Sequence, residues 1–160
     1  MINLRKLISI VILLSTTFVF AQQNKKVFDS HNTRDTIYLN KTGIVEHYSN
    51  CRSIDDDTLE QNKILQALQP INIQLAGFIR REKFDFKTKD SVVTLIHKYY
   101  VNSKGEIEYC TFFAHSKLSN RTTRRYAMLL EEFIEGRKVN YESKTPFFIC
   151  GSSSLRLKQK

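Results

Sequence analysis

The side chains most able to do covalent chemistry are three cysteines, Cys51, Cys110 and Cys150, together with four histidines. A cysteine nucleophile needs a nearby base that accepts its proton. His97 and Cys110 form the one candidate pair, because the strands that carry them are predicted to lie side by side. A core cysteine next to a histidine is usually a packing contact, so we expect no catalytic residue and no enzymatic activity. A small envelope enzyme built on this pair is kept as an alternative.

Metal-binding patterns are weak. His47 and Cys51 have a four-residue spacing that brings two ligands together only on a helix, and this stretch is predicted to be a strand followed by a loop. Asp55, Asp56 and Asp57 are adjacent and lack the alternating spacing and the distant glutamate of a calcium loop. No glycine-rich phosphate loop occurs in the sequence. We therefore expect neither a metal site nor a cofactor.

The first residues have the pattern of an export signal. Arg5 and Lys6 precede an uncharged run, Leu7–Phe20, and Ala21 supplies a small residue for cleavage. An apolar run of this kind fits a secretory signal peptide better than a membrane-spanning helix, which needs about 20 residues. We expect residues 1–21 to be removed and the protein to be periplasmic or secreted, with no stable membrane span. The alternative is that this segment is retained as an N-terminal anchor.

Removal of residues 1–21 leaves 160 − 21 = 139 residues, the size of one domain. The signal holds two of the 25 basic residues and none of the 16 acidic ones, so the remaining charge is 23 − 16 = +7. Such a charge favours acidic partners or anionic membrane surfaces. The basic residues are scattered and not interleaved with aromatic ones, so nucleic acid is not an expected partner. An oxidising compartment permits one disulfide among the three cysteines, and all three pairings are open.

Two elements are expected ahead of the domain core. Residues 22–35 are polar and predict a short tether. In the stretch "TIYLNKTGIVEHY", Thr36–Tyr48, apolar residues flank Asn40–Gly43, which is typical of a β-hairpin turn. Residues 36–160 are expected to form a single α+β domain.

The core begins with a helix and a hairpin. The helix is predicted over Ser53–Leu68 and should end at Pro70; a short strand is expected near Arg81–Lys87. The hairpin has the strongest β pattern, since Val92–Val101 and Glu106–Ala114 are rich in β-branched and aromatic residues.

A four-residue loop, Asn102–Gly105, would set the register of this hairpin. It places His97 opposite Cys110 and Leu95 opposite Phe112. These four side chains then share one face, which is predicted to be the buried face.

A second helix and a last strand complete the core. The stretch "SNRTTRRYAMLLEEFIEG" has apolar residues at helical spacing, with a possible cap at Ser119 or Asn120 and a closing glycine, Gly136. The final strand is predicted over Phe147–Leu157, directly after Pro146. The predicted fold is an antiparallel sheet with two helices packed on one face, plus an N-terminal β-hairpin.

This α-β-β-α-β order, with "YYVNSKGEIEYCTFFAHS" leading into "RRYAMLLEEFIEG", resembles the TonB C-terminal domain family. The resemblance covers roughly residues 59–157, within a core of about residues 55–157. Tyr99, Val101, Gly105 and Ile107 fill the places of that family's aromatic-x-Val pair, turn glycine and following aliphatic residue. The chain lacks the family's W-x-[FY]-x-P ending, and two prolines cannot make a Pro-rich spacer. An energy transducer coupled to an inner-membrane motor is therefore not expected.

The resemblance implies a three-stranded antiparallel sheet whose last strand lies at an edge and pairs with an extended peptide. An unpaired strand edge is a template for another strand in any fold. We therefore expect an exported protein-binding module that recruits a protein partner in the cell envelope by strand addition. The expected contact residues are Phe147, Ile149, Gly151, Ser153 and Leu155 on the strand, and Arg124 and Arg125 on the second helix.

Three alternatives remain open for these contact residues. The last strand can be an ordinary packed strand. Arg124 and Arg125 lie early in their helix, at the end that disfavours cations, and can be tolerated surface charges. The protein can also be a secreted inhibitor or structural protein that binds an acidic partner through its basic surface. The sequence leaves the oligomeric state open.

Overall fold

The structure is a computed structural model that describes residues 25–50 and 58–157. Among these residues, five strands form one mixed sheet in the order β1-β4-β3-β5-β2. None of the described helices is long and apolar enough to cross a membrane. The expected signal peptide lies outside the described residues. The elements are β1 (Val27–Asp29), α2 (Thr33–Thr42), α3 (Ile44–His47), β2 (Ser49–Asn50), α4 (Thr58–Arg81), β3 (Val92–Val101), β4 (Ile107–Ala114), α5 (Asn120–Ile134) and β5 (Phe147–Arg156).

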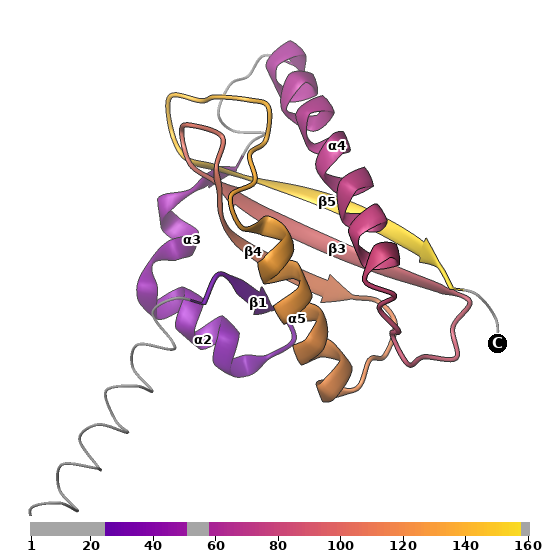
Figure 1. The fold of residues 1–160 in the computed structure, drawn as a ribbon. Helices are drawn as coiled ribbons and strands as arrows, with labels where there is room; N and C mark the ends of the chain where they lie inside the picture. Colours follow the sequence, from indigo (N-terminus) through magenta and orange to yellow (C-terminus); the bar gives the residue numbers. More distant parts are fainter. Residues whose placement is uncertain (1–24, 51–57, 158–160) are drawn as a thin grey trace, which may run out of the picture.

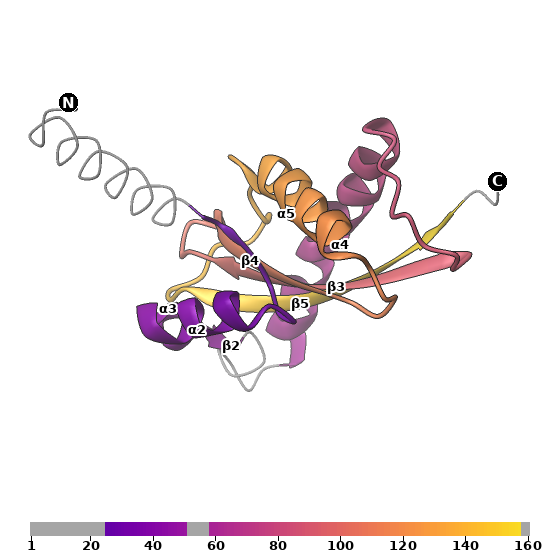
Figure 2. The same cartoon turned by 90° about the horizontal axis from the view of Figure 1, so that it is seen from below.

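The fold is α+β, as predicted, and its centre has the expected order α4-β3-β4-α5-β5. Helices α4 and α5 cover one face of the sheet (Figure 1). Helices α2 and α3 lie on the opposite side from α5 (Figure 2). The main core therefore lies between the sheet and the pair α4 and α5.

The turn between β3 and β4 forms where the sequence predicts it. Asn102 N donates to Glu106 O over 3.0 Å and closes a three-residue loop. Gly105 has φ 80°, the left-handed conformation for which glycine is suited. A Cβ at this position would lie 2.6 Å from Val139 O and 2.7 Å from Tyr141 O. Glycine is thus required both for the turn and for the close approach of the chain that follows α5.

The register of this hairpin differs from the prediction by two residues. His97 lies opposite Phe112, and Cys110 lies opposite Tyr99, so the expected pairing of His97 with Cys110 is wrong. One residue of the shift comes from the shorter loop. The other comes from a bulge next to Tyr100, which adds one residue to β4.

A two-residue shift keeps every side chain on its predicted face. Leu95, His97, Cys110 and Phe112 are all buried in the main core, as predicted. The second helix is also confirmed: Ser119 caps α5 by accepting a hydrogen bond from the backbone at its start. Its apolar face is buried, with Tyr126, Leu130, Phe133 and Ile134 in the core. The last strand is confirmed as β5.

Helix α4 runs through Pro70 and ends at Arg81, so the predicted helix end at Pro70 and the predicted strand near Arg81–Lys87 are wrong. Proline removes one helical hydrogen bond and crowds the preceding turn. An apolar stripe continues on both sides of it at helical spacing, and its burial outweighs that cost. The buried stripe consists of Ile64, Leu68, Ile71, Leu75, Phe78 and Ile79.

The predicted N-terminal hairpin over Thr36–Tyr48 is wrong, because these residues lie in α2 and α3. Asn32 caps α2 by accepting a backbone hydrogen bond at the start of the helix. Gly43 has φ 65°, the conformation expected of it, but it separates two helices. Such a glycine suits a helix end as well as a hairpin turn. Here α2 is held against the sheet by Tyr38, whose ring stacks on Phe28 of β1.

The residues before α2 belong to the sheet, so the predicted tether over residues 22–35 is wrong for the part that is described. β1 pairs in parallel with β4 and places Val27 opposite Cys110. Val27 and Phe28 are both buried. Lys26 N donates to Glu131 on α5 over 2.8 Å, and Lys26 O accepts from Cys110 N over 2.8 Å. Residues 25–35 are thus part of the folded domain.

Candidate functional site

Strand β5 has one flank along which the described residues pair only in part. On one side it pairs with β3 along all ten of its residues, Phe147–Arg156. On the other side β2 pairs with it only at Phe147 and Phe148. Within the part of the chain that the structure describes, no strand pairs with this second flank from Ile149 to Arg156. We call this stretch the open flank.

The unpaired backbone groups of the open flank belong to alternate residues. Leu157 N donates to Ser91 O over 2.9 Å, so these two opposite residues form a hydrogen-bonded pair. Hydrogen-bonded pairs alternate along an antiparallel ladder, and the odd-numbered residues of β5 therefore bond to β3. The even-numbered residues Cys150, Ser152 and Ser154 direct their N–H and C=O groups toward the open flank.

The side chains predicted to meet a partner face the core instead. Phe147, Ile149 and Leu155 are buried, which follows from their large apolar side chains at alternate positions. The odd-numbered side chains of this strand were predicted to contact the partner. Their alternation with small polar residues indicates instead that the odd-numbered side chains are buried and the even-numbered ones are exposed. The exposed side chains are those of Cys150, Ser152, Ser154 and Arg156.

Gly151 allows α4 to approach β5 closely. A Cβ at this position would lie 2.8 Å from Asn72 Nδ2 and 2.9 Å from Leu68 Cδ2. Asn72 Oδ1 and Ser153 Oγ are buried next to this contact and have no hydrogen-bond partner among the described residues. Ser153 is 9% exposed. Each unpaired buried polar atom costs free energy. Asn72 was missed because its helix was expected to end before it.

The open flank lacks the features that usually protect a strand edge. Such edges carry charges, prolines or bulges, or are very short. β5 is ten residues long, has an unbroken register with β3, and has no charged residue or proline before Arg156. It is therefore geometrically suited to pair with an added strand.

A cation lies over β5 on the sheet face away from α4 and α5. Lys98 on β3 is opposite Cys150, and its Nζ lies 3.5 Å from the centroid of the Phe148 ring. Burial lowers the pKa of Lys98. The ammonium group is thus held over an aromatic ring of β5, on the sheet face where Cys150 and Ser152 are exposed.

The two predicted arginines lie far from β5 in the sheet order. They are on α5, which contacts β1 and β4. The Arg125 guanidinium lies over the Phe84 ring, 5.4 Å from its centroid. Arg124 lines a cavity beside β1. The predicted contact residues therefore do not form one site: those on β5 and those on α5 lie in different parts of the fold.

His97 and Cys110 do not form a nucleophile and a base. His97 Nε2 lies 2.7 Å from the hydroxyl of Tyr126, and Cys110 Sγ lies 3.4 Å from Thr111 O. Burial raises the pKa of the Cys110 thiol well above its usual value, so the reactive thiolate is disfavoured. Cys110 and the exposed Cys150 are free thiols, and Cys51 lies outside the described residues.

No cluster of three or more potential metal ligands occurs in residues 25–50 and 58–157.

Comparison of the chain with known protein families, with curated proteins and with solved structures finds no match. The functional assignment therefore depends on the geometry of this chain. That geometry offers a strand edge suited to pairing and a separate cavity beside β1.

Proposed function

We propose that the protein is an exported protein-binding module, which recruits an envelope protein by addition of a β-strand to the open flank of β5. The observation that carries the proposal is a regular ten-residue strand, without a charged residue before Arg156, that the described residues pair fully on one side only. The resemblance to the TonB C-terminal domain family supports the same mode of binding. Main-chain hydrogen bonds would supply the affinity, and neighbouring side chains would supply the specificity.

The partner segment should be extended and should carry acidic side chains. The ammonium group of Lys98 lies over Phe148 of β5, and the chain without residues 1–21 has a charge of 23 − 16 = +7. A net charge of this sign attracts an acidic partner over long distances.

Amide hydrogen exchange tests whether the flank is open. In the free protein, the amides of Ser152 and Ser154 should exchange rapidly, because they point away from β3. The amides of Gly151 and Ser153 should exchange slowly, because they bond to β3. Slow exchange at Ser152 and Ser154 in the free protein would show that another segment already covers the flank, and the proposal would then be wrong.

A proline substitution tests the pairing itself. Ser152→Pro removes an outward-pointing donor but leaves the ladder to β3 intact, since proline is tolerated where the N–H faces away from the sheet. A photo-crosslinking residue at position 154, used in intact cells, should attach to one main partner, and Ser152→Pro should abolish that adduct. Ser152→Ala keeps the N–H and should leave the adduct unchanged. An adduct of equal yield in both variants would contradict strand addition.

A further inference from the structure

A cavity of about 990 Å³ lies between β1, the start of α2 and the start of α5, at the other end of the sheet from β5. Small-molecule sites in proteins usually have volumes of roughly 300–1,000 Å³. The cavity is therefore large enough for an organic ligand. It does not involve the open flank, and the inference drawn from it is independent of the proposed function.

The cavity has an excess of positive charge. Lys25, Arg34, Lys117 and Arg124 line it together with two carboxylates, which gives 4 − 2 = +2 with neutral histidines. Arg34, Lys117 and Arg124 come from three different segments, and no ion pair is formed by any of them with the residues described. Three unpaired cations around one cavity favour an anionic ligand.

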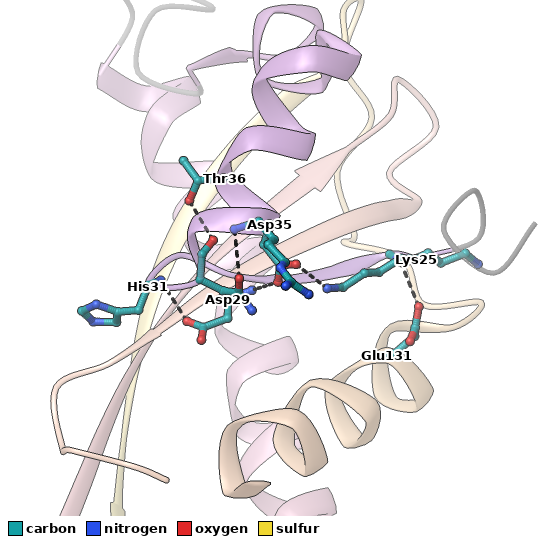
Figure 3. A network of polar contacts seen from close by, with 9 residues as sticks. Lys25, Asp29, His31, Asp35, Thr36 and Glu131 are labelled. Carbon is teal, nitrogen blue, oxygen red and sulfur yellow. Dashed lines mark hydrogen bonds and ion pairs between the residues drawn. The ribbon is translucent and has the colours of Figure 1, made fainter. Parts of the chain in front are cut away.

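The two carboxylates of the cavity are already engaged by the protein (Figure 3). Asp35 forms an ion pair of 2.6 Å with Lys25 and accepts the backbone N–H of Asp29 over 2.9 Å. The Asp29 carboxylate accepts the backbone N–H of His31 over 3.0 Å. Neither carboxylate forms an ion pair with Arg34, Lys117 or Arg124 within the described chain. These three cations therefore have no ion-pair partner among the described residues.

Helix α5 adds to this positive potential. Its first turn contains no acidic residue, and Arg121 and Arg124 lie near its N-terminus. The N-terminal end of a helix carries a partial positive charge that disfavours cations and favours anions. Asn120 and Thr123 in the first turn line the cavity. An anion bound here would therefore stabilise the start of α5.

Part of the cavity lining is apolar. Leu118 follows Lys117 in the chain, Ala127 lies one turn after Arg124 on α5, and Ala114 lies at the end of β4. These three apolar side chains are half-buried, whereas Phe28 and Phe112, which also line the cavity, are almost completely buried. An inorganic ion would leave the half-buried apolar surface in water, whereas a ligand with an apolar body would bury it.

We propose that this cavity binds a phosphate monoester that carries an apolar group. A phosphate monoester has a charge of about −1.5 to −2 at pH 7, which matches the +2 of the lining. The phosphate would lie between Lys117 and Arg124 at the start of α5, and the apolar group would lie on Leu118 and Ala127. A soluble organic phosphate and a lipid phosphate headgroup share this chemistry.

Calorimetric titration of the purified protein with phenyl phosphate at constant ionic strength tests the proposal. Binding should be saturable and roughly tenfold tighter than that of inorganic phosphate. Arg124→Gln and Lys117→Gln should each weaken it about tenfold. Arg125→Gln is the matched control: it removes the same charge at the next position, outside the cavity lining, and should change affinity less than about twofold.

Three outcomes would overturn the proposal: no saturable binding, equal weakening by Arg125→Gln, or equal affinity for inorganic phosphate and phenyl phosphate. A second measurement uses the unsubstituted protein, in which phenyl phosphate should shift the amide resonances of Thr33–Asp35 and Asn120–Thr123; shifts elsewhere only would also overturn it.

Vesicles of phosphatidylcholine with phosphatidic acid distinguish a lipid phosphate headgroup from a soluble organic phosphate. Binding to them that Arg124→Gln abolishes identifies a lipid headgroup, and no such binding identifies a soluble phosphate.

Discussion

His97 lies in the main core, where its Nε2 is 2.7 Å from the Tyr126 hydroxyl. Its Nδ1 has no hydrogen-bond partner among residues 25–50 and 58–157. Burial lowers the pKa of His97 to about 4, so the ring is neutral at pH 7. Its chemical type made it a candidate base in the sequence, but its environment makes it a neutral core residue. The consequence is a pH-dependent stability.

We expect the free energy of unfolding to fall as the pH falls from 7 to 5. The folded pKa of His97, about 4, is below the usual value of 6.5, so the unfolded chain binds the proton more readily in this window. The contribution of neutral His97 to the free energy of unfolding is fully present above pH 6.5. It decreases as the pH falls toward the folded pKa of about 4. Each pKa unit corresponds to 1.36 kcal/mol, so lowering the pH to 5 should cost about 2 kcal/mol, measured by urea unfolding.

The control for this prediction is the double variant His97→Phe with Tyr126→Phe. It replaces both partners of the buried hydrogen bond by apolar groups of similar shape, which is tolerated better than leaving one of them unpaired. Its stability should vary less between pH 7 and pH 5 than that of the unsubstituted protein. An unchanged pH dependence would show that His97 is not the group responsible.

The hairpin of β3 and β4 illustrates how one element depends on a distant one. Its turn was predictable, because Gly105 follows a turn-forming Asn102. The contact of Gly105 with Val139 O and Tyr141 O was not, since it joins the turn to the chain after α5. Gly136 has a similar conformation, φ 66°, but a Cβ there would meet nothing within 4 Å.

Gly105→Ala should therefore destabilise the protein more than Gly136→Ala. A left-handed conformation costs a non-glycine residue about 1–2 kcal/mol, and this cost applies to both variants. Overpacking against backbone atoms adds about 1–3 kcal/mol at Gly105 only. Urea unfolding should show a loss of about 3 kcal/mol for Gly105→Ala and about 1 kcal/mol for Gly136→Ala. Equal losses would mean that the contact with the chain after α5 does not constrain the turn.

Strand β1 is the edge strand of the sheet at the end far from β5. Figure 3 shows how contacts link this segment to α5 through Glu131 and to α2 through Asp35. Phe28 of β1 is buried, and the ring of Tyr38 on α2 stacks on it. Residues that a composition argument assigns to a tether are thus part of the core.

Phe28→Ala should destabilise the whole domain. Truncation of a buried phenylalanine costs about 3–5 kcal/mol, which is a large part of the stability of a domain of this size. Ile37→Ala on α2 is the matched control, because Ile37 is 48% exposed, and it should change the stability by about 0.5 kcal/mol or less. Thermal unfolding measures both variants. A Phe28→Ala protein as stable as the control would restore the tether interpretation.

The sequence carried enough information for β3, β4, α5 and β5, because alternation and helical spacing within one segment indicate which face is buried. It was misleading where one local signal suits two structures, as at Gly43, or where a local cost is outweighed, as at Pro70. The hairpin register, the place of β1 in the sheet, the open flank of β5 and the cavity beside β1 all depend on contacts between residues far apart in the chain. Backbone pairing and close packing join such residues through space, and no local pattern records which of them meet.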